Sequence, residues 1–140
     1  MFLLDTNVIS ELRRPQKANR NVKAWADAIP VTSFYLSAIT ILELEIGVLL
    51  LTRKDARAGA ALRTWLEGQI LPDFEGRILH VDNAVALRCA SLHVPLPRPI
   101  HDSLIAATAM VHSMTLATRN RSDFEGTGVV LVDPWLQQTR

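Results

Sequence analysis

The chain has one cysteine, few aromatic residues and almost no excess of charge of either sign. Cys89 has no second cysteine to pair with, so an internal disulfide is excluded, and its position in a helical pattern favours a small core residue. Fifteen Lys and Arg residues against fourteen Asp and Glu give a net charge of +1. The chain as a whole therefore lacks the basic character of a nucleic-acid binder, and any such binding must be local.

Long apolar runs are also missing. No uninterrupted run approaches the roughly 20 residues that a membrane-spanning helix needs, and the N-terminus lacks the basic start and apolar stretch of a signal peptide. A chain of 140 residues can bury roughly two-thirds of its unfolded surface, and no segment is polar or repetitive enough to predict disorder before the last few residues. We therefore expect one soluble, cytoplasmic domain over residues 1–140.

Short apolar segments alternate with segments of helical periodicity. The segments typical of buried strands are residues 2–4, 34–36, 77–81, 116–118 and 128–132. The segments with helical spacing of apolar residues are 8–12, 21–29, 39–50, 55–70, 82–93 and 101–114. Pro72 should end the helix before it, and Gly47 is interpreted as a point of close packing. This alternation predicts an α/β fold with a parallel sheet covered on both faces, because parallel strands need crossover connections.

Four acidic residues are predicted to share one edge of the sheet: Asp5 at the end of the first strand, Glu43 in the first turns of the helix after the second strand, Asp102 at the start of the helix 101–114, and Asp123 in the loop after the fourth strand. The carboxyl ends of parallel strands share one edge of a sheet, which is where ligands collect in open α/β folds. Carboxylates gathered there raise one another's proton affinity, so the cluster favours a divalent cation. Oxygen ligands without His or Cys at ligand spacing indicate Mg²⁺ or Mn²⁺ in preference to zinc. Each acid alone also fits an ordinary cap, turn or surface position, and the joint placement carries the prediction.

Four sequence blocks support a more specific interpretation. They are FLLDTN at 2–7, SAITILEL at 37–44 with Gly47, DSLIAATA at 102–109, and TRN at 118–120 followed by Asp123 and Phe124. In this order and spacing the chain resembles PIN-domain nucleases, and within that superfamily VapC-type toxins of type II toxin-antitoxin systems. The segment SELRRP at 10–15 and the pair Pro134-Trp135 are most similar to the FitB-like branch.

The resemblance implies a three-layer α/β/α fold with a five-stranded parallel sheet and a metal-dependent endoribonuclease toxin that hydrolyses RNA phosphodiester bonds. It implies that the four acids are the catalytic and metal-binding residues, with Mg²⁺ or Mn²⁺ as cofactor. Thr6 and Asn120 match positions that orient the carboxylates or the attacking water, and Thr6 and Asn7, next to Asp5, are expected to hold its carboxylate. The partners implied are RNA, a cognate VapB-type antitoxin and a second copy of the chain, with operator DNA bound only through the antitoxin and no membrane.

Other residues around the proposed centre have two interpretations. Arg119 and Arg121, next to the end of the fourth strand, are the predicted RNA contacts, whereas Arg13 and Arg14 fit solvated loop arginines equally well. His101 should lie at the rim of the site, because neighbouring helix positions point about 100° apart. The apolar side chains of Leu44, Val48, Leu51 and Trp65 could line a groove for an antitoxin helix or belong to the core.

Three alternatives stay open beside the nuclease. A phosphotransferase of the haloacid-dehalogenase type would want a second Asp two residues after the first, where this chain has Asn7. A response-regulator receiver would want an acidic pair near the first strand and an Asp for phosphorylation after the third. The third alternative is a catalytically weak PIN module that acts by binding protein or nucleic acid.

Overall fold

The sheet consists of five parallel strands in the order β3–β2–β1–β4–β5. The computed structural model describes residues 1–137, so the C-terminal residues for which disorder was expected lie largely outside the described part. The strands are β1 (Phe2–Leu4), β2 (Phe34–Ser37), β3 (Ile78–Leu79), β4 (Thr115–Ala117) and β5 (Leu131–Val132). Because β2 and β3 extend from β1 to one side and β4 and β5 to the other, the strand order reverses between β1 and β4, which is where ligands bind in such sheets.

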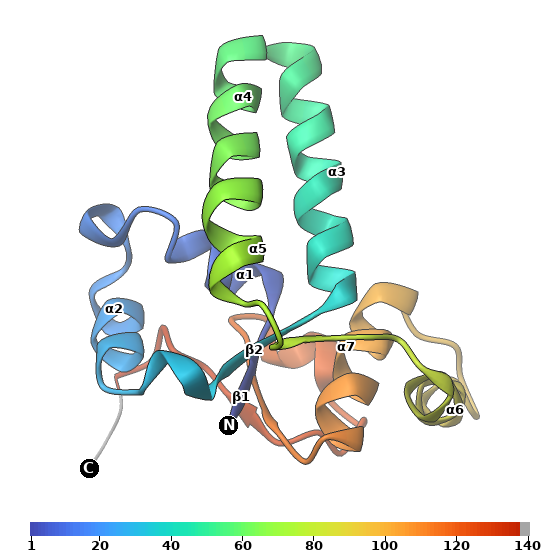
Figure 1. Cartoon of the computed structure of the whole chain (residues 1–140). Coiled ribbons are helices and arrows are strands. Elements are labelled where there is room, and N and C mark those ends of the chain that lie inside the picture. Colours follow the sequence, from blue (N-terminus) through green and yellow to red (C-terminus); the bar gives the residue numbers. More distant parts are fainter. Residues whose placement is uncertain (138–140) are drawn as a thin grey trace.

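Helices cover both faces of this sheet (Figure 1). They are α1 (Thr6–Glu11), α2 (Arg20–Asp27), α3 (Ala38–Lys54), α4 (Ala56–Trp65), α5 (Leu71–Asp73), α6 (Asn83–Leu92) and α7 (Ile100–Val111). Polar side chains accept hydrogen bonds from the first backbone N–H groups of several of them: Asp5, Asn19, Ser37, Asp55 and Asp82. Helices α3 and α4 form an antiparallel hairpin that projects beyond the sheet (Figure 1).

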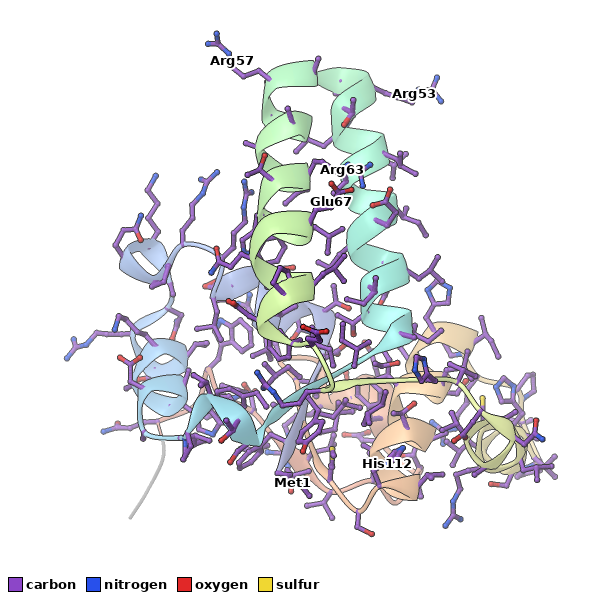
Figure 2. The ribbon with its side chains drawn as sticks, viewed as in Figure 1. Met1, Arg53, Arg57, Arg63, Glu67 and His112 are labelled. Atoms are coloured by element: carbon purple, nitrogen blue, oxygen red, sulfur yellow. The ribbon has the colours of Figure 1, made fainter. Side chains whose placement is uncertain are left out.

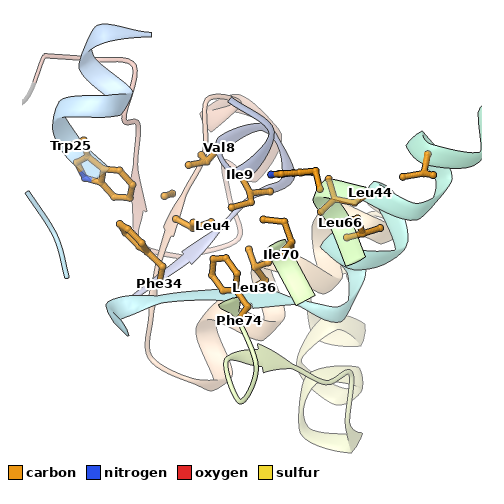
Figure 3. Close-up of a cluster of buried hydrophobic side chains, with 13 residues drawn as sticks. Leu4, Val8, Ile9, Trp25, Phe34, Leu36, Leu44, Leu66, Ile70 and Phe74 are labelled. Atoms are coloured by element: carbon orange, nitrogen blue, oxygen red, sulfur yellow. The ribbon is translucent and has the colours of Figure 1, made fainter. Parts of the chain in front are cut away.

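Neighbouring residues of the central strand point into different apolar clusters, as the twofold side-chain alternation of a strand requires. Leu4 packs with Val8 and Ile9 of α1, and with side chains from α2 and from the base of the α3–α4 hairpin (Figure 3). Leu3 packs with Ile105 and other side chains of α7 on the opposite face. The predicted three-layer α/β/α architecture with a five-stranded parallel sheet is thus confirmed.

The helix predicted over residues 55–70 does not end at Pro72. It continues through a π-helical turn, η3 (Leu66–Ile70), into α5 (Leu71–Asp73). A proline ring inside a regular α-helix collides with the carbonyl one turn earlier and removes a hydrogen bond. The wider π turn, in which the Leu71 N–H donates to the Leu66 carbonyl, accommodates this break in the regular pattern.

The glycine that allows close packing in the hairpin is Gly59, and the expectation for Gly47 was wrong. A Cβ added to Gly59 would lie 2.5 Å from the Cα atom of Thr52, whereas one added to Gly47 would meet no atom within 4 Å. Helix α3 therefore approaches the start of α4 at a position where only hydrogen fits. Within residues 1–137, no helix combines the length and the apolar composition that crossing a bilayer requires.

Candidate active site

Asp5 lies at the centre of the candidate site. It follows β1 and caps α1, and only 6% of its surface is exposed. Its Oδ1 atom accepts a hydrogen bond of 2.8 Å from the Thr6 backbone N–H, and its Oδ2 atom accepts one of 2.8 Å from the hydroxyl of Thr118. Both carboxylate oxygens are therefore held at the carboxyl end of the central strand.

Asn7 and Thr118 connect the end of β1 to the end of β4. The Asn7 side-chain amide lies 3.4 Å from Asp5 Oδ2 and 3.4 Å from Thr118 Oγ1, and it accepts a hydrogen bond of 3.3 Å from the backbone N–H of Arg119. The backbone N–H of Asn120 donates to Thr118 Oγ1 at 3.1 Å. This network fixes the orientation of Asp5 relative to the TRN block.

Glu43 reaches the site from the second turn of α3. The Thr6 hydroxyl donates to its Oε1 atom at 2.8 Å and lies 3.3 Å from the hydroxyl of Thr40. The Nδ1 atom of His101 lies 3.7 Å from Glu43 Oε2, and the His101 side chain is 41% exposed. His101 therefore lies at the rim of the site, as expected, and contacts one of the acids there.

Asp102 lies in the first turn of α7 and Asp123 in the short 3-10 helix η4 (Arg121–Phe124) that follows β4. Asp102 interacts electrostatically with each of the other three acidic side chains. Burial raises the pKa of Asp5 to about 6, with further contributions from Asp102 and Glu43 that its hydrogen bonds oppose. The pKa of Asp102 is raised by burial and then by Asp123 and Glu43, against the opposing effect of His101.

The donor set suits a hard divalent cation. Within residues 1–137, no Lys or Arg forms an ion pair with any of the four acids, so of the basic side chains in this part only His101, at the rim, offsets part of their mutual repulsion. Carboxylate oxygens are the ligands that Mg²⁺ and Mn²⁺ prefer. In the described part of the chain, no three acidic, His or Cys side chains are grouped closely enough to hold an ion as they stand. A cation held by three of the four carboxylates would therefore require Asp102 or Asp123 to move toward Asp5 and Glu43, which are held by hydrogen bonds.

The predicted RNA contacts lie at the same sheet edge. Arg119 follows Thr118 directly, and its guanidinium carbon lies 5.2 Å from the ring centroid of Trp135. Arg121 begins η4 and is exposed, like Arg119. Asn120, predicted to orient the carboxylates or the water, lies between them and donates its backbone N–H to the network.

The two interpretations of the hairpin's apolar residues are now separated. Leu44, Val48 and Trp65 are buried in the core and do not line an open groove, whereas Leu51 is only partly buried. The exposed apolar side chains of α3 are instead Leu42, Ile46, Leu49 and Leu50. Sequence periodicity had placed both sets on an apolar helix without showing which set the base of the hairpin covers.

Sequence reasoning missed Thr118. This residue is fully buried, and its hydroxyl donates a hydrogen bond of 2.8 Å to Asp5, shorter than the 3.4 Å bond from Asn7. The available signal was its position, since it is the last residue of the predicted fourth strand, 116–118, and Asp5 directly follows the first. A threonine there is ordinary in a strand, and only the pairing of β1 with β4 brings its hydroxyl to the carboxylate.

Comparison with known proteins identifies the family. Residues 2–129 match the PIN domain. The chain is 44% identical to toxin FitB of Neisseria gonorrhoeae, with 96% of this chain and 99% of that protein covered. It is 38% identical to VapC ribonuclease Y4jK of Sinorhizobium fredii, with 96% and 98% covered. The solved structure of FitAB bound to an IR36 DNA fragment matches with a TM-score of 0.88 and 42% identity, covering 99% of each chain. The chain therefore belongs to the PIN domain family, within the VapC-type toxins that include FitB.

Proposed function

We propose that this protein is a metal-dependent endoribonuclease toxin that a cognate antitoxin neutralises. The observation that carries the proposal is the placement of four carboxylates at one edge of the sheet. The pKa values of Asp5 and Asp102 are raised there. Within residues 1–137, the only basic side chain that pairs with any of the four carboxylates is His101 at the rim. Such repulsion is unfavourable unless a cation offsets it. Membership of the PIN family and the relative named a ribonuclease support the same activity.

The proposed ligands of Mg²⁺ or Mn²⁺ are Asp5, Glu43, Asp102 and Asp123. A bound divalent cation supplies activation of water as a nucleophile and stabilisation of charge on the phosphate. Within the chain, Thr6 holds Glu43 through its hydroxyl and Asp5 through its backbone N–H, so both carboxylates are oriented before a cation arrives.

Thr118 and Asn7 restrain the second oxygen of Asp5 in the same way. Asn120 is proposed to orient the attacking water from the loop after β4. Arg119 and Arg121 are proposed to contact RNA phosphates beside the site, because arginine side chains bind phosphate oxygens and both residues are exposed at this edge. The stacking of Arg119 on Trp135 limits the entropy that it would lose on binding.

The proposed protein partners are a VapB-type antitoxin and a second copy of this chain, with operator DNA bound only through the antitoxin. One relative is named a toxin, and the matching solved structure is of FitAB bound to a DNA fragment. The exposed apolar side chains of α3 form the surface that we propose an antitoxin covers. The proposed location is the cytoplasm, where RNA and an antitoxin would be available.

Induced expression in a bacterium without the antitoxin tests this function. The wild type should arrest growth and fragment cellular RNA, and Asp5→Asn, which keeps the shape of the side chain, should do neither. Circular dichroism of both purified proteins checks that the variant folds. Growth arrest of equal strength by folded Asp5→Asn protein would contradict the proposed role of the carboxylates.

A further inference from the structure

A basic cavity of about 290 Å³ lies at the far end of α1 from the carboxylates. It is lined by Ser10, Glu11, Arg13, Arg14 and Lys17. Helix α1 (Thr6–Glu11) begins directly after Asp5 and rises 1.5 Å per residue, so Glu11 lies roughly 8 Å along the helix from its start, and Arg13 follows in the turn after the helix. The cavity is thus separate from the carboxylates but joined to them by one short helix.

The cavity has a net positive charge, because Arg13, Arg14 and Lys17 outnumber the one carboxylate that lines it, Glu11. Within residues 1–137, no acidic side chain forms an ion pair with Arg13, Arg14 or Lys17. Glu11 lines the same cavity, but its Oε1 atom accepts a hydrogen bond of 3.2 Å from the backbone N–H of Asn19. Partial burial and the neighbouring Arg14 lower the pKa of Arg13. A bound anion would relieve this repulsion.

Arg13 is held in position by an aromatic ring. Its guanidinium carbon lies 5.8 Å from the ring centroid of the buried Trp65, and Arg119 beside the candidate site is placed over Trp135 in the same manner. A guanidinium fixed in this way loses little freedom when it binds an anion. The two stacked arginines therefore provide ordered positive charge both at the carboxylates and at the end of α1.

We propose that the cavity of Arg13, Arg14 and Lys17 binds a backbone phosphate of single-stranded RNA on one side of the scissile bond. The proposal rests on the proposed function and adds a second contact to the same substrate. Arginine and lysine side chains that contact phosphates set the register of a nucleic acid on a protein without reading its bases. A docked protein helix would instead need an apolar groove, and this cavity is lined almost wholly by polar and charged residues.

The test compares two pairs of substitutions in the full chain carrying Asp5→Asn, in which cleavage is expected to be absent. Arg14→Ala with Lys17→Ala removes two cations from the cavity and leaves Arg13 on Trp65. Arg53→Ala with Arg57→Ala removes the same charge from the tip of the α3–α4 hairpin, where both side chains project away from the sheet (Figure 2). The probe is a fluorescent single-stranded RNA oligonucleotide, and its Kd is measured over a range of salt concentrations.

We expect the double variant Arg14→Ala with Lys17→Ala (the cavity pair) to bind RNA more weakly than the parent chain. The slope of its log affinity against log salt should be smaller by about 0.7 for each phosphate that the protein no longer neutralises. The reduction in affinity should be the same for oligonucleotides of different base composition. The double variant Arg53→Ala with Arg57→Ala (the hairpin pair) should leave the salt slope unchanged. Equal effects of the two pairs would overturn the proposal. Retained RNA binding by the cavity pair, together with abolished binding of a polyglutamate peptide, would also overturn it and assign the cavity to a protein. Cleavage of RNA by the Asp5→Asn chain itself would instead contradict the proposed function.

Discussion

Asp5 is buried, and its negative charge lowers the stability of the folded chain when no cation is bound. Its pKa rises from an ordinary 3.8 to about 6 in the folded state, mainly because of burial. Between these values the folded chain keeps a proton that the unfolded chain releases, so the metal-free protein should lose stability as the pH rises through this interval. One pKa unit corresponds to about 1.4 kcal/mol, which makes the full cost near neutral pH on the order of 3 kcal/mol.

Asp5→Asn should therefore raise the free energy of unfolding of the metal-free protein by about 1–3 kcal/mol at pH 7.5, because it removes the buried charge. It should also flatten the dependence of stability on pH between about 4 and 6. Urea denaturation in EDTA measures both effects. In excess Mn²⁺ the order should reverse, because a cation that binds the folded wild type stabilises it. A variant less stable than the wild type in EDTA at pH 7.5 would argue against this account of the charge.

Thr118 should act as a positioning residue for Asp5. Thr118→Val keeps the shape of the side chain but removes the donor to Asp5 Oδ2 and the acceptor for the Asn120 N–H. We expect Mn²⁺ affinity to fall by about 10-fold or more, as is usual when a partner that orients a ligand is removed. Thr118→Ser, which restores the hydroxyl, should recover most of it. Calorimetric titration with Mn²⁺ gives both values, and equal affinities for the Val and Ser variants would exclude the positioning role.

The candidate site shows what sequence reasoning can find at the level of residues. Asp5, Glu43, Asp102 and Asp123 were predicted because acidic residues at strand ends and helix starts are visible without coordinates. Thr118 was not predicted, because its hydroxyl reaches Asp5 only through the pairing of β4 with β1. The contact of His101 with Glu43 joins two helices far apart in the sequence, and no spacing in the chain indicates it.

The α3–α4 hairpin carries a matched pair of glycines that report on helix packing. Gly59→Ala should destabilise the protein by about 1–3 kcal/mol, because the new methyl group would overlap Thr52 and force the helices apart. Gly47→Ala should stabilise it by about 0.5–1 kcal/mol, because the site is open and alanine has less backbone entropy to lose in a helix. Chemical denaturation of the two variants measures the difference. Stability changes of the same sign in both variants would contradict this difference in packing between Gly47 and Gly59.

At the level of elements, the positions of strands and helices were largely predictable, and their ends were not. The expected strands 77–81 and 128–132 are shorter in the structure, where β3 and β5 each contain two residues. Gly128 has a φ of +84°, a left-handed conformation outside the range of a strand, which moves the start of β5 along the chain. The continuation of the helix past Pro72 depends on a π turn. The spacing of apolar residues in the sequence does not indicate the wider hydrogen-bond spacing of this turn.

For the whole molecule, the strand order explains why one edge of the sheet collects residues from four separate segments. β1 lies in the centre, so the segment after it meets those after β2 and β4 and the start of α7. The alternation of apolar segments predicts a parallel sheet, and a parallel sheet places all carboxyl ends on one side. The strand order itself was not predictable from periodicity, because the pattern of apolar residues in a strand does not indicate which other strand it pairs with.

The central claim is that this edge cleaves RNA with a divalent cation held by the carboxylates, and metal removal tests it most directly. The purified chain is treated with EDTA, dialysed, and mixed with a single-stranded RNA while Mn²⁺ is titrated back. Cleavage should be absent in EDTA, should return with Mn²⁺ for the wild type, and should stay absent at every Mn²⁺ concentration for Asp5→Asn. Cleavage that persists in EDTA, or that Mn²⁺ restores equally to wild type and Asp5→Asn, would contradict the claim.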